Sequence, residues 1–300
     1  MPGTTELPRT RGLLLSVDVD SLDLYLSLYG HAVDDASARA LVETTYTVGV
    51  SRFLELFDEL GVSATFFAVG RDLAVPAAGR VLSAAAAAGH TVGNHTFSHR
   101  YDFIRLPEEA ARDEILRGHT AVERTVGKPP VIFRAPGYNM TSREYALLDA
   151  MGYRYDASPL PSPPYLAIKY TVMAGVRILG RRSRSIWGNP AAFAGATRPY
   201  RRGSLLVLPN AVSPVLRLPV IGTTLSTAPG PLYDHFLSAL AREEFVSLEF
   251  HAVDLMERQE DGLPEPLRAQ RDLSIPVSVK RARFRRFIES LKERLPLFTP

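Results

Sequence analysis

The sequence predicts an α/β protein built as a (β/α) barrel, with an open doubly wound sheet as the second choice. Short apolar runs alternate along the chain with longer segments of helical period, which is the pattern of a parallel sheet covered by helices. The alternation extends over most of the 300 residues. Polar residues follow the ends of several expected strands, where barrel enzymes carry their chemistry.

The expected strands are short buried runs bounded by turn or cap residues. The first, GLLLSVDVDS at 12–21, is apolar until it ends in two aspartates. The later strands are expected at 63–70, 91–97, 131–137, 203–209 and 245–253.

The expected helices lie between these strands. In the segment 45–61, apolar residues recur at helical spacing, and Gly61 follows as a C-cap. The other helices are expected at 77–90, which is rich in alanine, at 107–127, which has acids in its first turn, at 142–152, which begins at a Ser or Thr N-cap, and at 279–295.

The composition limits the chemistry. The chain is 46% hydrophobic and 22% charged, as expected for a globular protein, and we expect one catalytic domain over residues 1–300. It contains no cysteine, which excludes disulfides, thiolate metal sites and a cysteine nucleophile. A metal site would have to use His, Asp, Glu or backbone oxygen.

The N-terminus predicts a cytoplasmic protein. Its longest early apolar run is Leu13 to Leu15, whereas a signal peptide needs roughly 7–15 apolar residues and a membrane span about 20. We therefore expect a cytoplasmic location, with peripheral attachment at the inner face of the membrane as a further option.

The stretch HTVGNHTFSH, residues 90–99, and the end of the first strand together suggest a metal site. His95 and His99 are four apart, so on a helical turn they would share a face. Asp18 and Asp20 would point to the same side of a strand, where two adjacent carboxylates need a cation or an arginine. One Asp and two His make a three-ligand site with an open position, as hydrolytic metals require.

Further candidates for catalysis follow later strands. The remaining carboxylate would act as a general base, and His251 in SLEFHAVD could supply an acid. Arg134, in FRAPG, follows another strand. Several such residues at strand ends point to an active site.

These motifs, in this order, resemble those of the NodB-homology polysaccharide deacetylases. SVDVD resembles the first motif of that family, HTFSH matches its His-(Ser/Thr)-x-x-His motif, RAPG resembles Arg-x-Pro, YDAS the fourth motif, and LEFH the Leu-x-x-His motif. The resemblance covers roughly 12–157 and 245–295. It implies a distorted (β/α) barrel of the polysaccharide deacetylase type.

The resemblance also implies a role for each matching residue. Asp20, His95 and His99 would hold a divalent ion, most often zinc, with Co, Ni, Mn or Fe as alternatives.

The remaining roles concern the reaction itself. Asp18 would be the base, paired with Arg134. His251 would protonate the leaving amine, oriented by Asp156, with Asp254 as a rival for that role. A backbone amide after Pro136, at Gly137 or Tyr138, would hold the oxyanion.

The segment from Ala157 to Tyr233 contains no Asp or Glu. Within it, YLAIKYTVMAGVRILG at 165–180 fits an amphipathic helix at an interface. Two interpretations of 158–233 stay open: a solvated insertion, or a lid and docking surface for an anionic, lipid-bearing substrate or an anionic membrane. No nucleic acid is expected. The nine cations of the segment are Lys169, Arg177, Arg181, Arg182, Arg184, Arg198, Arg201, Arg202 and Arg217.

The function expected from the sequence is metal-dependent removal of an N-acetyl or N-formyl group from an amino sugar. By similarity to the aminoarabinose-lipid deformylases, the sugar would be linked to a nucleotide or a lipid phosphate. One alternative is a cyclic-amide hydrolase of the allantoinase-like type, which the Arg-x-Pro context of Arg134 argues against. Another is an inactive carbohydrate- or membrane-binding module, which the full set of ligands, base and acid argues against.

Overall fold

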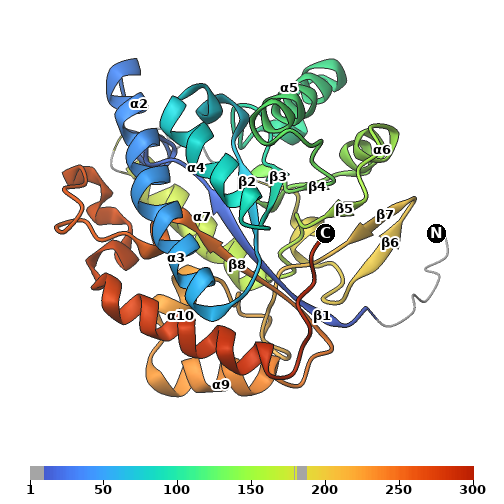
Figure 1. The fold of residues 1–300 in the computed structure, drawn as a ribbon, viewed down its shortest axis with the longest axis vertical. Helices are drawn as coiled ribbons and strands as arrows, with labels where there is room; N and C mark the ends of the chain where they lie inside the picture. Colours follow the sequence, from blue (N-terminus) through green and yellow to red (C-terminus); the bar gives the residue numbers. More distant parts are fainter. Residues whose placement is uncertain (1–9, 179, 181–187) are drawn as a thin grey trace.

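The centre of the molecule is one curled eight-stranded sheet (Figure 1). The computed structural model describes residues 10–178, 180 and 188–300. The strand order is β6-β7-β5-β4-β3-β2-β1-β8, and every neighbouring pair is parallel except the antiparallel pair β6 and β7. The strands are β1 (Gly12–Val19), β2 (Thr65–Ala68), β3 (Thr91–Asn94), β4 (Ile132–Phe133), β5 (Tyr155–Asp156), β6 (Tyr200–Arg202), β7 (Leu205–Val207) and β8 (Phe245–His251).

An irregular segment after β7 joins the two sides of the sheet. The Leu208 N–H donates to the Asp156 carbonyl oxygen at 2.7 Å, and the Ala211 N–H donates to the Ser247 carbonyl oxygen at 2.9 Å. Residues 208–211 therefore run from β5 to the free edge of β8. This connection gives a distorted (β/α) barrel, which confirms the first choice made from the sequence.

Helices surround the sheet (Figure 1). α3 shows why they pack there: its buried residues Phe53, Leu56, Phe57 and Leu60 recur at helical spacing, and it ends at Gly61 with φ +59°. The helices are α1 (Leu22–Leu28), α2 (Asp35–Thr44), α3 (Ser51–Leu60), α4 (Pro76–Ala87), α5 (Glu108–Val126), α6 (Ser142–Ala150), α7 (Pro163–Ile178), α8 (Gly222–Thr227), α9 (Gly230–Leu240) and α10 (Val277–Lys292).

Residues 45–50 form a π-helix that leads into α3, where the sequence predicts a continuous α-helix. Gly49 allows the π-helix to approach the backbone of Ala252, because a Cβ at position 49 would lie 2.6 Å from the Ala252 carbonyl oxygen. The π-helix thus packs directly behind the turn that follows β8.

The acid-free segment contributes to the fold itself. α7 matches the helix predicted at 165–180, and β7 pairs with β5. Part of the segment 158–233, namely β7, therefore belongs to the central sheet. Arg181, Arg182 and Arg184 lie outside the described residues.

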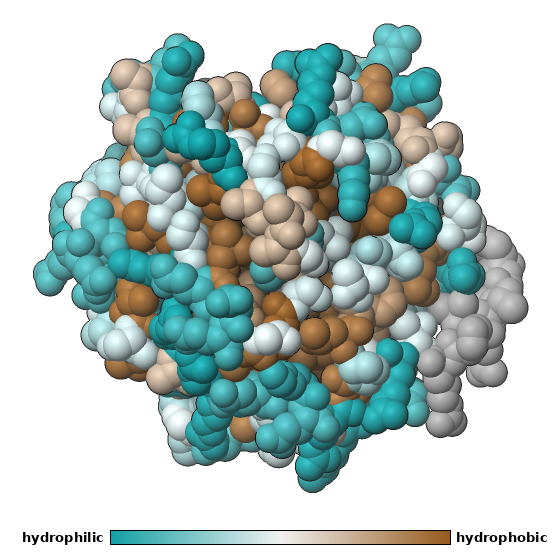
Figure 2. Space-filling model, viewed as in Figure 1, coloured by the Kyte–Doolittle hydropathy of each residue, from teal (hydrophilic) through white to brown (hydrophobic). Residues whose placement is uncertain are grey.

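The surface is mixed in character. On the face seen in Figure 2, hydrophilic side chains dominate the rim and apolar side chains gather toward the middle. None of the helices in the described part of the chain is both long and apolar enough to cross a membrane.

Candidate active site

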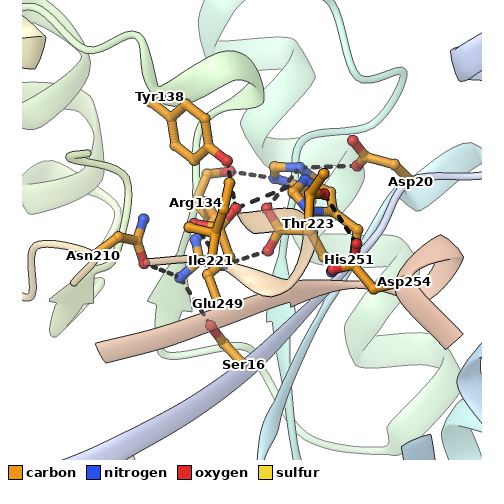
Figure 3. Close-up of polar contacts among 12 residues, drawn as sticks. Ser16, Asp20, Arg134, Tyr138, Asn210, Ile221, Thr223, Glu249, His251 and Asp254 are labelled. Atoms are coloured by element: carbon orange, nitrogen blue, oxygen red, sulfur yellow. Dashed lines mark hydrogen bonds and ion pairs between the residues drawn. The ribbon is translucent and has the colours of Figure 1, made fainter. Parts of the chain in front are cut away.

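The structure brings most of the predicted site residues together at the carboxyl ends of the parallel strands. Figure 3 labels Asp20, Arg134 and His251 among them. Asp18 lies in β1, and Asp20 follows it. His95 follows β3, Arg134 follows β4, and His251 ends β8. In a (β/α) barrel, this edge of the sheet is where catalytic residues lie.

Asp20, His95 and His99 form a group that fits a divalent cation. Oδ1 of Asp20 lies 3.2 Å from Nε2 of His95 and 3.2 Å from Nε2 of His99, and all three side chains are buried. Oδ1 of Asp20 and both ring nitrogens of His99 have no hydrogen-bond partner among the described residues. Buried polar atoms without partners are rare, and an oxygen with two imidazole nitrogens is a donor set suited to zinc.

The hydrogen bonds of His95 orient it for this role. Its Nδ1 lies 2.8 Å from the backbone carbonyl oxygen of Arg134. A carbonyl can only accept, so Nδ1 carries the proton and Nε2 is left to face Asp20. For His99, burial lowers the pKa to about 4, which keeps its imidazole neutral, as a ligand must be.

The two histidines do not lie on a helical turn, so that part of the sequence interpretation is wrong. They lie in a loop after β3 in which Thr96 and His99 have positive φ values of 63° and 52°. Such values are uncommon outside glycine and are held only where surrounding contacts impose them.

Those contacts come from α5. Glu114 accepts hydrogen bonds from Ser98, at 2.9 Å from its N–H and 2.7 Å from its hydroxyl. Gly118 permits the close approach, because a Cβ there would lie 2.3 Å from Oδ1 of Asn94 and 2.8 Å from the carbonyl carbon of Thr96. The strained loop brings the two histidine rings to a centroid distance of 4.7 Å.

Arg134 pairs with Asp18, as the sequence predicts. Its Nη1 donates to Oδ1 of Asp18 at 2.5 Å, while the other oxygen, Oδ2, lies 3.8 Å from Nε2 of His95. The guanidinium is fully buried, and its remaining donors reach Ser16 Oγ at 3.0 Å, Asn210 Oδ1 at 3.0 Å and the Ala157 carbonyl oxygen at 2.9 Å. Asp18 is thus fixed between Arg134 and the candidate metal group.

The carboxylate nearest the His251 ring is Glu249, a residue that the sequence interpretation missed. Its Oε1 lies 3.7 Å from Nε2 of His251 and accepts the Tyr138 hydroxyl at 2.5 Å (Figure 3). Burial opposes the charged ring, but Glu249 and then Asp18 raise the pKa of His251 to about 9. The sequence could have indicated this contact, because Glu249 and His251 are residues i and i+2 of one strand and such residues share a face.

Asp156 and Asp254 have other contacts. The Asp156 carboxylate accepts the hydroxyl of Ser158 at 2.5 Å, and in the described structure no hydrogen bond or ion pair joins it to His251. Asp254 accepts the backbone N–H of His251 at 2.8 Å and the Thr223 hydroxyl at 3.0 Å. Asp254 therefore fixes the end of β8, and among the described residues neither aspartate carboxylate bonds to the His251 ring.

Asp18, Glu249 and His251 form a second group whose ligand atoms lie within 4.8 Å of one another. Nη1 of Arg134 lies 2.5 Å from Asp18 and 3.9 Å from Glu249, so the guanidinium already supplies the positive charge there. This group is better suited to proton transfer than to a second cation.

The two residues predicted to hold the oxyanion, Gly137 and Tyr138, differ in their backbone amides. The Tyr138 N–H donates to the Ala135 carbonyl oxygen at 3.2 Å, and the Gly137 N–H has no acceptor among the described residues. Gly137 has φ +61°, and a Cβ there would lie 3.3 Å from the ring of Tyr101, which packs on His99 at a centroid distance of 4.9 Å. Of the two residues predicted for the oxyanion, Gly137 is therefore the one with an available donor.

Comparison with known proteins agrees with these motifs. The sequence profile of the polysaccharide deacetylase family matches residues 33–155. Over 159 residues the chain is 28% identical to the peptidoglycan deacetylase-like protein FGM2 of Gibberella zeae, covering 52% of this chain and 46% of that one. Over 144 residues it is 30% identical to a peptidoglycan deacetylase of Helicobacter pylori, covering 47% of each. The matched region thus spans slightly less than half of these relatives.

Solved structures show the same fold. The PuuE allantoinase has a TM-score of 0.60 at 15% identity, over 96% of this chain and 86% of that one. A Mycobacterium smegmatis protein assigned to the polysaccharide deacetylases has a TM-score of 0.56 at 20% identity, with the same coverage. A CE4 family pseudoenzyme from Bacillus anthracis has a TM-score of 0.50 at 14% identity, over 97% of this chain and 64% of that one.

A fold shared by these three proteins does not decide activity, which depends on the site. The ordered motifs, the profile match over residues 33–155 and the curated relatives agree with one another, and they show that this part of the chain is similar to the polysaccharide deacetylases.

Proposed function

We propose that the protein is a metal-dependent hydrolase that removes an N-acyl group, acetyl or formyl, from an amino sugar. The observation that carries this proposal is the buried Asp20, His95 and His99 group, whose ligand atoms lack partners, beside the Asp18–Arg134 pair. The names of the curated relatives, which are peptidoglycan and chitin deacetylases, support this reaction class.

The chain's own residues divide the reaction between them. A zinc ion held by Asp20, His95 and His99 would polarise the amide carbonyl and acidify a water. Asp18 accepts the proton of the attacking water as the new C–O bond forms, and the hydrogen bond from Arg134 holds Asp18 in place. The free Gly137 N–H donates to the developing oxyanion.

His251 completes the reaction as the acid. Its pKa of about 9, raised against burial by Glu249 and Asp18, keeps the imidazolium protonated at neutral pH. The ring donates its proton to the sugar nitrogen as the C–N bond breaks, so the amine leaves neutral. We assign the orienting role predicted for Asp156 to Glu249, because Glu249 is the carboxylate that faces the ring.

We further propose that the amino sugar is linked to a nucleotide or a lipid phosphate. The support is the acid-free, basic segment 158–233, whose α7 exposes Ile168, Arg177 and Ile178 at the surface. Apolar and basic side chains on one exposed helix are typical of a helix at an anionic lipid surface. The same observation supports peripheral membrane attachment from the cytoplasmic side.

The test is a substrate screen that measures acetate and formate. Wild-type protein loaded with zinc is offered N-acetyl and N-formyl amino sugars as free oligomers, nucleotide-linked sugars and lipid-linked sugars, with allantoin as the cyclic-amide control. Release from an amino sugar, abolished by chelation and restored by zinc, is expected. Turnover of allantoin alone would replace the proposal with the cyclic-amide alternative, and zinc binding without any turnover would favour an inactive module.

A further inference from the structure

Lys169 of α7 carries a buried ammonium group without a partner. Its Nζ has no hydrogen-bond partner among the described residues. Burial lowers the pKa of Lys169 to about 8, and no described carboxylate offsets that effect. Desolvating an unpaired ammonium costs folding free energy, so its place in the structure calls for an explanation.

Two other buried cations, Lys280 and Arg134, have hydrogen-bond partners. Nζ of Lys280 donates to the carbonyl oxygens of Met256 at 2.5 Å and Asp272 at 3.0 Å. Arg134 bonds to four different residues, including Asp18. Lys169 differs from both, because none of the described residues provides an anion or a carbonyl oxygen for it.

The position of Lys169 connects it to the candidate active site. Its Nζ lies 3.4 Å from the point that a Cβ on Gly137 would occupy, and the Gly137 N–H has no acceptor among the described residues. One helical turn earlier, Tyr165 packs on Tyr138 at a centroid distance of 5.3 Å, and Tyr138 bonds to Glu249. α7 thus places the ammonium beside the loop that would receive the substrate.

No described carboxylate lies close enough to Lys169 to pair with it. The segment 157–233, which carries Lys169, contains no Asp or Glu. Lys169 Nζ and the uncharged side chains of Tyr101 and Asn139 all lie within 3.5 Å of the point that a Cβ on Gly137 would occupy, and the centroid of the Phe193 ring lies 5.9 Å from Nζ. Lys169 can therefore pair with an anion that a ligand brings.

We propose that Lys169 binds an anionic group, a carboxylate or a phosphate, that the substrate carries next to the amide to be hydrolysed. This inference rests on the proposed function and specifies its substrate class. A charge-assisted hydrogen bond in a partly desolvated position is strong, so it would select anionic over neutral amino sugars. The alternative role, stabilising the oxyanion of the reaction itself, would affect every substrate equally.

The kinetic test compares three N-acetyl sugars. These are the methyl glycoside of N-acetylglucosamine, which is neutral, N-acetylmuramic acid, which bears a carboxylate, and N-acetylglucosamine 1-phosphate. In Lys169→Met the ratio of kcat/KM for the anionic over the neutral sugar should fall at least about tenfold, the effect of losing one hydrogen bond to a charged group. Lys169→Arg should keep most of the ratio, and Lys128→Met, which removes an exposed lysine, should keep all of it.

A binding measurement separates this inference from the proposed function. In protein carrying Asp18→Asn, which prevents turnover, calorimetry gives the affinity for the same three sugars with and without Lys169→Met. The anionic preference should again fall at least about tenfold. If no sugar is hydrolysed, the proposed function fails and this binding ratio alone decides the role of Lys169.

Two results would overturn the inference. Equal losses on neutral and anionic sugars would show that Lys169 serves the common reaction, and an unchanged ratio in both measurements would show that it binds no anion. The melting temperature checks the fold, because replacing an unpaired buried charge with methionine should not lower it. The carboxylate and phosphate arms identify which anion the site prefers.

Discussion

The backbone carbonyl oxygen of Arg134 accepts the Nδ1–H of His95 at 2.8 Å. The same residue donates its guanidinium to Asp18 at 2.5 Å. Arg134 therefore orients a candidate metal ligand through its main chain and the candidate base through its side chain. A substitution at this position can separate the two roles.

Arg134→Lys should retain the metal but lose catalysis. The backbone carbonyl is unchanged, so His95 keeps its orientation, while lysine lacks the planar fork that reaches Asp18, Ser16 and Asn210 together. We expect kcat/KM to fall by at least about tenfold, the cost of an interaction with a charged group, with metal content near one per chain. Arg100→Lys, in an exposed pair with Asp102, serves as the control. Loss of metal in Arg134→Lys would contradict the separation.

The candidate metal ligands and the base should behave differently on substitution. Asp20→Ala, His95→Ala and His99→Ala each remove a donor and should lose the ion in elemental analysis. Asp18→Asn should keep the ion and lose nearly all turnover, because Asp18 is held by Arg134 and supplies a proton acceptor. If Asp18→Asn lost the ion as readily as Asp20→Ala, the division between the two carboxylates would be wrong.

The pH profile of kcat/KM should be bell-shaped, and its basic limb should report His251. The acid must be protonated, so activity falls as pH rises through its pKa of about 9. Glu249→Gln removes a negative charge that stabilises the imidazolium, which lowers the pKa of His251 and moves the basic limb to lower pH. His251→Ala should flatten that limb and lower kcat.

Asp156→Asn is the matched control for this assignment. The Asp156 carboxylate bonds to Ser158, so its removal should leave the position of the basic limb unchanged, whatever it does to stability. A shift in Asp156→Asn with none in Glu249→Gln would return the orienting role to Asp156.

Sequence periodicity predicted the main strands and the helices between them, because strands and helices have fixed repeats, but it did not predict α1, α2, α8, α9 or β6. It also placed Asp18 and Asp20 on one side of β1. The two-residue repeat of a strand would also have placed Glu249 beside His251. A glutamate in a buried strand can equally be structural, however, and only the fold shows its contact with Tyr138. The spacing of His95 and His99 predicted their proximity for a wrong reason, since the loop is shaped by Glu114 and Gly118 of α5. The sequence could not predict the hydrogen bond between Arg134 and Asn210, because no local pattern links these two distant residues.

Gly118→Ala should weaken metal binding although it touches no ligand. A Cβ would lie 2.3 Å from Oδ1 of Asn94 and 2.8 Å from the carbonyl carbon of Thr96, which lies in the loop bearing His99. Overpacking of this kind costs about 1–3 kcal/mol of unfolding free energy, and α5 should push the loop away. Denaturant melts and zinc titration measure the two effects.

Gly79→Ala in α4 is the control for this prediction. Its nearest neighbour would be 3.8 Å away, an ordinary contact, and alanine favours the helix by up to about 1 kcal/mol. Gly79→Ala should therefore stabilise the protein and leave zinc affinity unchanged. Equal behaviour of the two alanine variants would show that the fit of Gly118 against the loop is unimportant.

The basic segment 158–233 should bind anionic vesicles and not neutral ones. In α7, Ile178 is 84% exposed beside the exposed Arg177, and Ile168 is 56% exposed. Each basic residue near an anionic surface contributes about 1 kcal/mol, and the binding should weaken steeply as salt shortens the Debye length to below about 8 Å.

Two sets of substitutions locate the vesicle contact. Arg177→Gln with Ile178→Ser tests the described helix, and joint replacement of Arg181, Arg182 and Arg184 by Gln tests the adjoining residues, which lie outside the described part. Both should reduce sedimentation with anionic vesicles, whereas Arg124→Gln in α5 should not. Hydrolysis of a small N-acyl sugar should change little in either, because β1, β3, β4 and β8 supply the metal group, base and acid. Equal binding to neutral and anionic vesicles, or none to either, would leave a soluble anion, such as a sugar nucleotide, as the partner of this segment.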